Sequence, residues 1–183
     1  MAEAPTHRLA LAHVTPYRGN GLAMDPAPER NRLLLRGQPD DAFLGVVVGI
    51  AGIAPPVAPN TAAISDAVTI LWLGPDEWLV ETAALPLGPF TAALAGSHAA
   101  VLDVSDAYTV IRLVGVRTPD VLSSGCSLDL HPRAFPGVAR TLLGKADVLL
   151  HRIGHAAEPT FDVYVARSYA DYLWRWLAVA ASG

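Results

Sequence analysis

The chain's only cysteine, Cys126, is followed by Asp129 and His131, so three side chains that can cooperate in catalysis or metal binding fall within six positions. A cysteine nucleophile needs a base held against it by the fold, normally a histidine distant in sequence. Neighbours along one extended loop point to alternate sides, and this trio matches no usual zinc spacing. We therefore interpret the stretch as the end of a helix, stopped by Gly125 in the left-handed conformation, and the loop that leaves it.

The remaining patterns that could carry chemistry are weak. His151 and His155 are four apart, but Gly154 lies between them and the segment reads as a strand running into a loop, without an HExxH motif. The chain shows no GxGxxG before a helix, no phosphate-binding loop before a lysine and no GxSxG elbow. Asp76 and Glu77 fall in a turn. The residues alone predict no catalytic, cofactor-binding or metal-binding site in this chain.

The charge and apolar content limit the classes of partner. The net charge is −4, and the thirteen basic residues are scattered singly, twelve arginines and Lys145, so no basic surface for nucleic acid is expected. The chain is 52% apolar and 16% charged, whereas soluble domains usually carry about 25% charged residues. Such a composition favours exposed apolar patches, which mark partner surfaces. We expect a subunit of a larger assembly.

The sequence predicts a cytoplasmic protein that does not cross a membrane. One cysteine permits no internal disulfide, which fits a reducing compartment, and the N-terminal residues lack the unbroken apolar core of a signal peptide. The uncharged run 42–65 is interrupted by three prolines, so it falls short of the ~20 residues that a spanning helix needs. Its Gly45-x-x-x-Gly49 spacing favours a short helix pressed closely on a sheet.

Hydrophobic periodicity and turn residues predict short strands that alternate with helices. Asp40 is placed to cap the first helix, and Gly74-Pro75-Asp76 and Gly144-Lys145 are suited to tight turns. The expected elements are strands over 32–37 and 160–167, hairpins over 67–83 and 138–152, a strand pair over 99–115, and helices over 40–52, 88–99, 116–125 and 168–181.

The starts of the last two helices carry capping signals. Thr118 precedes a proline suited to a first helical turn, and Ser168 with Asp171 resembles a capping box. The apolar spacing of the final helix predicts packing on a sheet rather than an aromatic platform for a flat ligand. The face expected to pack carries Tyr169, Tyr172, Leu173, Trp176, Leu177 and Ala180.

The two halves of the chain repeat a pattern. LLLRGQPDDAFLGVVVG resembles VIRLVGVRTPDVLSSG, and the hairpin ILWLGPDEWLV resembles ARTLLGKADVLL. We predict an α+β fold of two similar βαββ-type units packed together, because each unit is too small to bury its sheet alone. The units are expected over about 28–104 and 105–183, after a flexible segment 1–27.

Several longer motifs together resemble the gamma subunit of heterotetrameric sarcosine oxidase, over roughly 28–177. They are LWLGPDEWLVE, VLDVSDAYTVIRLVG, VLSSGCSLDLHPRAFPGVARTLLGKADVLLHR and FDVYVARSYADYLWRWL. More distantly, the Asp103-x-Ser105 strand pair resembles the folate-binding domain of aminomethyltransferases. That resemblance implies a fold of paired α+β units, in agreement with the repeat.

The resemblance also implies a function. The complex oxidatively demethylates sarcosine to glycine, passes the one-carbon unit to tetrahydrofolate and produces hydrogen peroxide. FAD, FMN and NAD would sit on the alpha and beta subunits, folate on alpha and zinc on delta, with gamma an auxiliary, non-catalytic subunit packed against alpha. Where aminomethyltransferases carry an Asp-Asp pair for folate chemistry, this chain has Ala146-Asp147, so Asp147 is the residue to test as a relic.

Three other functions stay open on sequence grounds. The chain could be the equivalent subunit of a related N-methyl amino acid dehydrogenase, a free-standing folate-binding or one-carbon-transfer protein, or an assembly protein of an unrelated enzyme. The surface that contacts alpha, and any influence of gamma on folate chemistry, are equally open, because the substrate-binding residues would lie on other chains.

Overall fold

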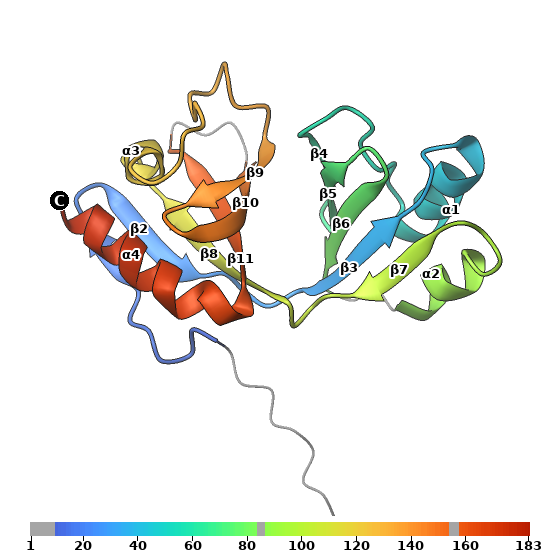
Figure 1. The fold of residues 1–183 in the computed structure, drawn as a ribbon, viewed down its shortest axis with the longest axis horizontal. Helices are drawn as coiled ribbons and strands as arrows, with labels where there is room; N and C mark the ends of the chain where they lie inside the picture. The colour runs from blue at the N-terminus through green and yellow to red at the C-terminus, as the bar shows by residue number, and fades with distance from the viewer. Residues whose placement is uncertain (1–9, 84–86, 154–157) are drawn as a thin grey trace, which may run out of the picture.

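The computed structural model describes residues 10–83, 87–153 and 158–183, which form two antiparallel sheets with helices on their outer faces (Figure 1). The six-stranded sheet has the order β1-β2-β8-β11-β10-β9, and the five-stranded sheet the order β4-β5-β6-β3-β7. The strands are β1 (Tyr17–Gly19), β2 (Leu22–Pro26), β3 (Asn31–Arg36), β4 (Ala62–Ile64), β5 (Val68–Gly74), β6 (Glu77–Thr82), β7 (Ala100–Asp103), β8 (Tyr108–Val114), β9 (Val138–Leu143), β10 (Ala146–Ile153) and β11 (Thr160–Ala166). The helices are α1 (Asp41–Ala51), α2 (Leu87–Ala93), α3 (Thr118–Ser123), the 3₁₀ turn η1 (Arg167–Tyr169) and α4 (Ala170–Ser182). The α+β class is confirmed.

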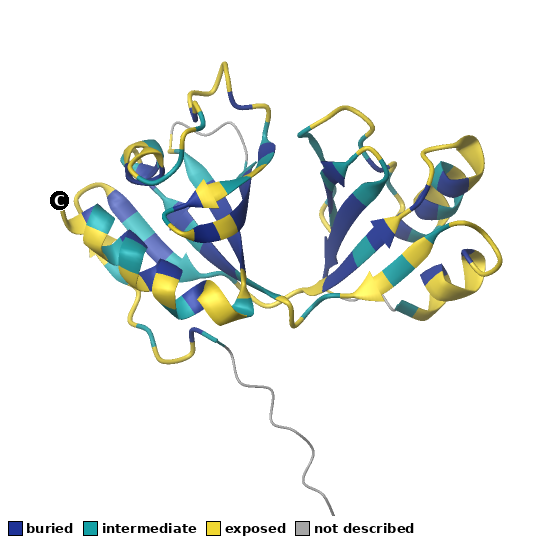
Figure 2. Ribbon diagram, in the orientation of Figure 1, coloured by how far each residue is buried: buried dark blue, intermediate teal, exposed yellow. Residues whose placement is uncertain are grey.

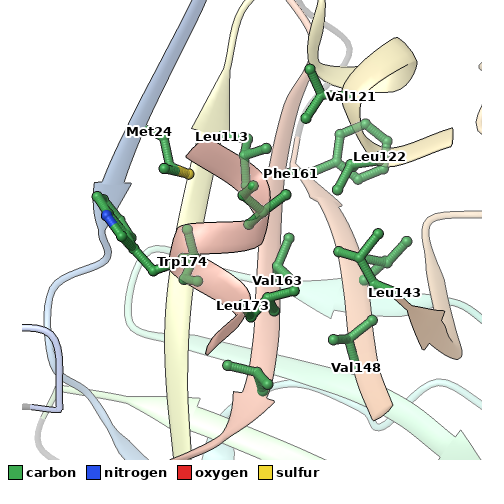
Figure 3. Close-up of a cluster of buried hydrophobic side chains, with 14 of the residues drawn as sticks. Met24, Leu113, Val121, Leu122, Leu143, Val148, Phe161, Val163, Leu173 and Trp174 are labelled. Atoms are coloured by element: carbon green, nitrogen blue, oxygen red, sulfur yellow. The ribbon is translucent and has the colours of Figure 1, made fainter. Parts of the chain in front are cut away.

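The two sheets face one another, and the protein has three apolar cores. One lies between the six-stranded sheet and α3 and α4, and Figure 3 shows Leu173 of α4 beside Val163 of β11 and Trp174 of α4 beside Met24 of β2. A second lies between the five-stranded sheet and α1 and α2. The third joins the inner faces of the two sheets, through residues such as Leu79. Each sheet therefore buries apolar residues on both of its faces, as layered packing requires.

The repeat is longer than predicted and its strands correspond differently. Both sheets contain the same unit, a strand, a helix, three strands and a second helix, with β4-β5-β6-β3 in one sheet matching β9-β10-β11-β8 in the other. The hairpin equivalent to β5–β6 is therefore β10–β11, so the sequence match of β5–β6 with β9–β10 is wrong. The hairpins β9–β10 and β10–β11 of the second unit have similar apolar spacing in sequence. Only the observed strand pairing shows which of them corresponds to β5–β6.

The N-terminal residues belong to the fold, so the expected flexible segment 1–27 is wrong where the structure describes it. β2 pairs with β8 and occupies the place that β7 takes beside β3 in the other sheet. Leu11, Leu22 and Met24 are buried in the core with α4. The chain thus closes its second unit with a strand from its beginning, and residues 1–9 lie outside the described residues.

The first helix begins as predicted but presents a different face. The Asp40 carboxylate accepts a hydrogen bond from the backbone N–H of Phe43 at 2.9 Å, and Gly52 ends the helix in the left-handed conformation. Gly45 and Gly49, expected to press on the sheet, instead face outward, and a Cβ added to either would have no neighbouring atom within 4 Å. Phe43 and Val47 make the contact with the sheet instead.

The third helix has Pro119 in its first turn, as predicted, but neither of its predicted capping residues. Its cap residue is Arg117, which makes no side-chain capping bond, and the Thr118 hydroxyl is buried without a hydrogen-bond partner. Gly125 is not left-handed. Its lack of a side chain is needed for a close approach, because a Cβ there would collide with the Trp176 ring and lie 3.0 Å from the backbone nitrogen of Gly144.

The final helix packs on its sheet, but with another face. No side chain caps α4, and the carboxylate of Asp171 pairs with His13 and Arg175 instead of closing a capping box. Leu173 and Leu177 are buried as expected, whereas Tyr169 and Tyr172 are exposed. The buried residues are Ala170, Leu173, Trp174, Leu177 and Ala181. No helix among the described residues combines the length and apolar character needed to span a membrane.

Candidate functional site between the sheets

A buried polar cluster joins the inner faces of the two sheets. The Tyr164 hydroxyl on β11 donates a 2.6 Å hydrogen bond to Glu81 on β6, and the Arg32 guanidinium on β3 lies 3.5 Å from the same carboxylate. Arg32, Glu81 and Tyr164 are each less than 8% exposed. Burial raises the pKa of Tyr164 well above its usual value, so the hydroxyl remains a donor. The cluster fixes one sheet against the other.

A second charged row crosses the inner face of the six-stranded sheet. Arg112 on β8 donates two 2.7 Å hydrogen bonds to the carboxylate of Asp162 on β11, a bidentate pair that raises the pKa of Arg112. His151 on β10 is the direct cross-strand neighbour of Asp162. Both ring nitrogens of His151 are buried without a hydrogen-bond partner, and its expected companion His155 lies outside the described residues.

His151 is expected to make the fold acid-sensitive. Burial lowers its pKa to about 4, from about 6.5 in an unfolded chain. Between these values the unfolded chain binds a proton that the folded chain does not, so stability falls as the pH falls. Urea unfolding should show that this group removes about 2 kcal/mol of the unfolding free energy between pH 7.5 and 5.

The matched variants separate this effect from general acid sensitivity. His151→Leu should lose the His151 share of the pH slope, because no imidazole is left to take up a proton. His98→Gln, which changes an exposed histidine, should keep the full slope. An unchanged slope in His151→Leu would show that another group is responsible.

The Asp103-x-Ser105 motif lies where the chain passes from β7 of the first unit to β8 of the second. The Asp103 carboxylate accepts hydrogen bonds from the backbone N–H and the hydroxyl of Ser105, at 2.9 and 2.6 Å, and these bonds lower the pKa of Asp103. The Ser105 hydroxyl oxygen in turn accepts from the backbone N–H of Arg32 at 2.9 Å. The motif therefore anchors the turn from β7 to β8 against β3, beside the buried cluster.

In the loop that follows Cys126, the polar side chains form hydrogen bonds with the backbone of the same loop. The Asp129 carboxylate accepts from the backbone N–H of His131 at 2.9 Å, and the His131 ring nitrogen Nδ1 accepts from the N–H of Arg133 at 3.2 Å. Cys126 is partly buried against the core under α3 and α4. These bonds agree with the interpretation of the stretch as a loop that leaves a helix.

Asp147 lies at a pocket on the inner face of the six-stranded sheet. The pocket has a volume of about 540 Å³ and is also lined by Tyr108, Arg140, Leu142 and Tyr164. Asp147 is exposed on β10, and Arg140 pairs with Glu77 across the sheets at 3.3 Å. An aspartate, an arginine and two tyrosines could hold a polar aromatic ligand, which makes Asp147 the residue to test.

The described ranges contain no group of three or more His, Cys, Asp or Glu side chains placed to hold a metal ion. The buried charges between the sheets are paired with each other, which suits a scaffold. Sequence analysis missed them, although Arg112 and Asp162 are each the single charged residue of an apolar strand. The buried charges are Arg32, Glu81 and Asp162, with the partly buried Arg112 as the partner of Asp162. The lack of catalytic and cofactor-binding residues stays a prediction.

The family is decided by comparison with known proteins. Residues 36–183 match the model of the family described as sarcosine oxidase, gamma subunit family. The chain belongs to the sarcosine oxidase gamma subunit family. A curated sarcosine oxidase subunit gamma from Arthrobacter sp. is 30% identical over 97% of this chain and 88% of its own length. The predicted resemblance is therefore confirmed over nearly the whole chain.

Solved structures agree with this assignment. A chain of the heterotetrameric sarcosine oxidase from Corynebacterium sp. U-96 superposes with a TM-score of 0.87 at 27% identity, covering 96% of this chain and 95% of that chain. The glycine cleavage system aminomethyltransferase T from Bartonella henselae superposes with a TM-score of 0.61 at 12% identity, over 86% of this chain and 45% of that chain. The second match shows a shared fold, as the resemblance implied.

Proposed function

We propose that this chain is the auxiliary, non-catalytic gamma subunit of a heterotetrameric sarcosine oxidase. The complex would demethylate sarcosine to glycine, transfer the one-carbon unit to tetrahydrofolate and produce hydrogen peroxide. The observation that carries this proposal is the near-complete match to a chain of a solved heterotetrameric sarcosine oxidase. The family membership of residues 36–183 supports it independently of the structure.

We assign the chemistry to the other subunits. FAD, FMN and NAD are placed on alpha and beta, tetrahydrofolate on alpha and zinc on delta, with alpha the direct partner of this chain and the cytoplasm its location. The pairing of Arg32 with Glu81 and of Arg112 with Asp162 joins neighbouring strands within each sheet, and the Tyr164–Glu81 hydrogen bond joins the two sheets, which supports a structural role. Gamma then contributes a folded surface to the assembly.

Co-purification tests the proposal. The full-length chain, co-expressed with the alpha, beta and delta subunits of the same organism, should elute with them in one complex that contains flavin and oxidises sarcosine. The proposal would be contradicted if the chain were recovered as a stable monomer that does not bind alpha, or if it co-purified with an enzyme that contains no flavin. Faster oxidation of another N-methyl amino acid would assign the same role in a related dehydrogenase.

A free-standing folate-binding protein is the second candidate, favoured by the pocket that holds Asp147 with Arg140 and Tyr164. It requires that this chain alone binds reduced folate, with an affinity that falls in Asp147→Asn. Under our proposal, titration calorimetry of the isolated chain with tetrahydrofolate gives no binding heat. A heat that disappears in Asp147→Asn would favour the second candidate.

A further inference from the structure

We propose that the outer helical layer of the five-stranded sheet, formed by α1 and α2, is the surface on which this chain receives an apolar helix of the alpha subunit of its complex. This inference rests on the proposed function, since it names the surface that the auxiliary subunit uses. Figure 2 shows exposed residues along the outward turns of both helices.

Beyond the start of α1, where Asp40 and Asp41 are exposed, the layer lacks the charges that normally keep a helical surface in water. From residue 42 to 65, and again from 82 to 102, the sequence contains no Asp, Glu, Lys or Arg. Among the described residues, these segments contain α1 after Asp41 and all of α2, which lie against each other, together with β4 and part of β7. The corresponding layer of the other sheet carries Asp120 on α3 and the Asp171–Arg175 ion pair on α4.

The exposed side of α1 has no explanation within the chain. Ala42, Gly45, Val48 and Gly49 are exposed, at the spacing of one helix face, and Val48 is 41% exposed. A Cβ at Gly45 or Gly49 would meet nothing within 4 Å. Because glycine inside a helix is markedly less favourable than alanine, two such glycines that face open space weaken α1 without benefit to the isolated chain. Close approach of another backbone would give them a purpose.

A groove beside this face offers a site for an anchoring side chain. It lies between α1 and the end of α2, has a volume of about 410 Å³ and is lined by Phe43, Val46 and Leu94 among others. The buried centres of protein interfaces are depleted in charged residues and use such pockets for aromatic or aliphatic anchors. The groove and the flat glycine face together suit a rod-like apolar element.

The chemistry of the layer selects its occupant. The charges of the layer are Asp40, which also lines the groove, and Asp41, both at the start of α1. The layer therefore offers no basic group to an acidic peptide or nucleic acid, and it lacks the lysines and arginines that draw an amphipathic helix to anionic lipid. Beyond the first turn of α1, a charged partner group would be buried unpaired, so the part of the occupant that contacts Gly45, Val48 and Gly49 must itself be uncharged. The similar chain of known structure comes from a heterotetrameric enzyme, which favours a different subunit over a second copy of this chain.

Variants of the full-length chain, co-expressed with the other three subunits, test the proposal. Val48→Glu should lower the amount of co-purified alpha at least tenfold, because a carboxylate would be buried unpaired. The double variant Gly45→Gln with Gly49→Gln should also lose alpha, yet its isolated melting temperature should rise by about 3 °C, since glutamine is the better helix former. Retained stability excludes misfolding as the cause.

Val179→Glu is the matched control, because it places the same charge on another exposed valine, 76% exposed on α4. This variant should co-purify with the same amount of alpha as the wild-type chain. Wild-type levels of alpha with Val48→Glu and with the double glutamine variant would overturn the docking surface alone. A homodimer of the isolated chain that Val48→Glu dissolves would assign the face to a second copy and overturn it too. Failure of the wild-type chain to bind any subunit would overturn the proposed function as well.

Discussion

Glu81→Ala should be among the most destabilising single changes in this protein, lowering the unfolding free energy by about 3–5 kcal/mol. The carboxylate is the shared acceptor of the Tyr164 hydroxyl and the neighbour of the Arg32 guanidinium. Its removal leaves the buried Arg32 guanidinium without its carboxylate counter-ion and the Tyr164 hydroxyl without its acceptor. Urea unfolding of the purified chain, followed by tryptophan fluorescence, measures the loss.

Glu77→Ala provides the control, because Glu77 lies on the same strand and also bridges the sheets, through Arg140. The Arg140 side chain is about half exposed, so this change should cost less than about 1 kcal/mol. Replacing both members of the buried pair, with Arg32→Met and Glu81→Leu, should recover most of the stability lost in Glu81→Ala. A cost for Glu81→Ala no larger than that for Glu77→Ala would show that the cluster does not hold the sheets together.

Gly115→Ala should be nearly as damaging, with a cost of about 3 kcal/mol or more. Gly115 follows β8 with φ +131°, a conformation that alanine rarely adopts, and an added Cβ would collide with the carbonyl oxygen of Gly21 and lie 3.1 Å from the Cα of Leu22. Both contacts are backbone and cannot move aside. Thermal unfolding should show a melting temperature lower by about 6–12 °C.

The comparison with Gly45→Ala tests whether the packing of the N-terminal strands contributes to the stability of the protein. Gly45 sits in open space within α1, so that substitution should stabilise the chain by about 0.8–1 kcal/mol. If Gly115→Ala were also neutral or stabilising, β2 would not pack against the start of the second unit as closely as the structure shows. The two glycines therefore test one residue type in opposite surroundings.

The sequence by itself determined the local elements of this protein. Alternating apolar residues, Asp40 before α1 and the Gly74 and Gly144 turns act over a few residues, so they placed most strands and helices correctly. The motifs also identified the family, because a set of strands and turns in fixed order is specific even when each member is weak. Short-range signals do not record which strands pair.

Only the tertiary structure decided where the N-terminal strands belong, which hairpins correspond in the two units, and which helix faces are buried. The sequence around Leu22 and Met24 did not predict a strand of the fold, and only the structure shows that β2 pairs with β8. Arg32 and Glu81 are 49 residues apart in sequence, and Tyr164 is a further 83 residues along. Their cluster depends on the packing of one sheet on the other, a long-range arrangement that no local pattern encodes, and that packing gives the buried charges their structural role.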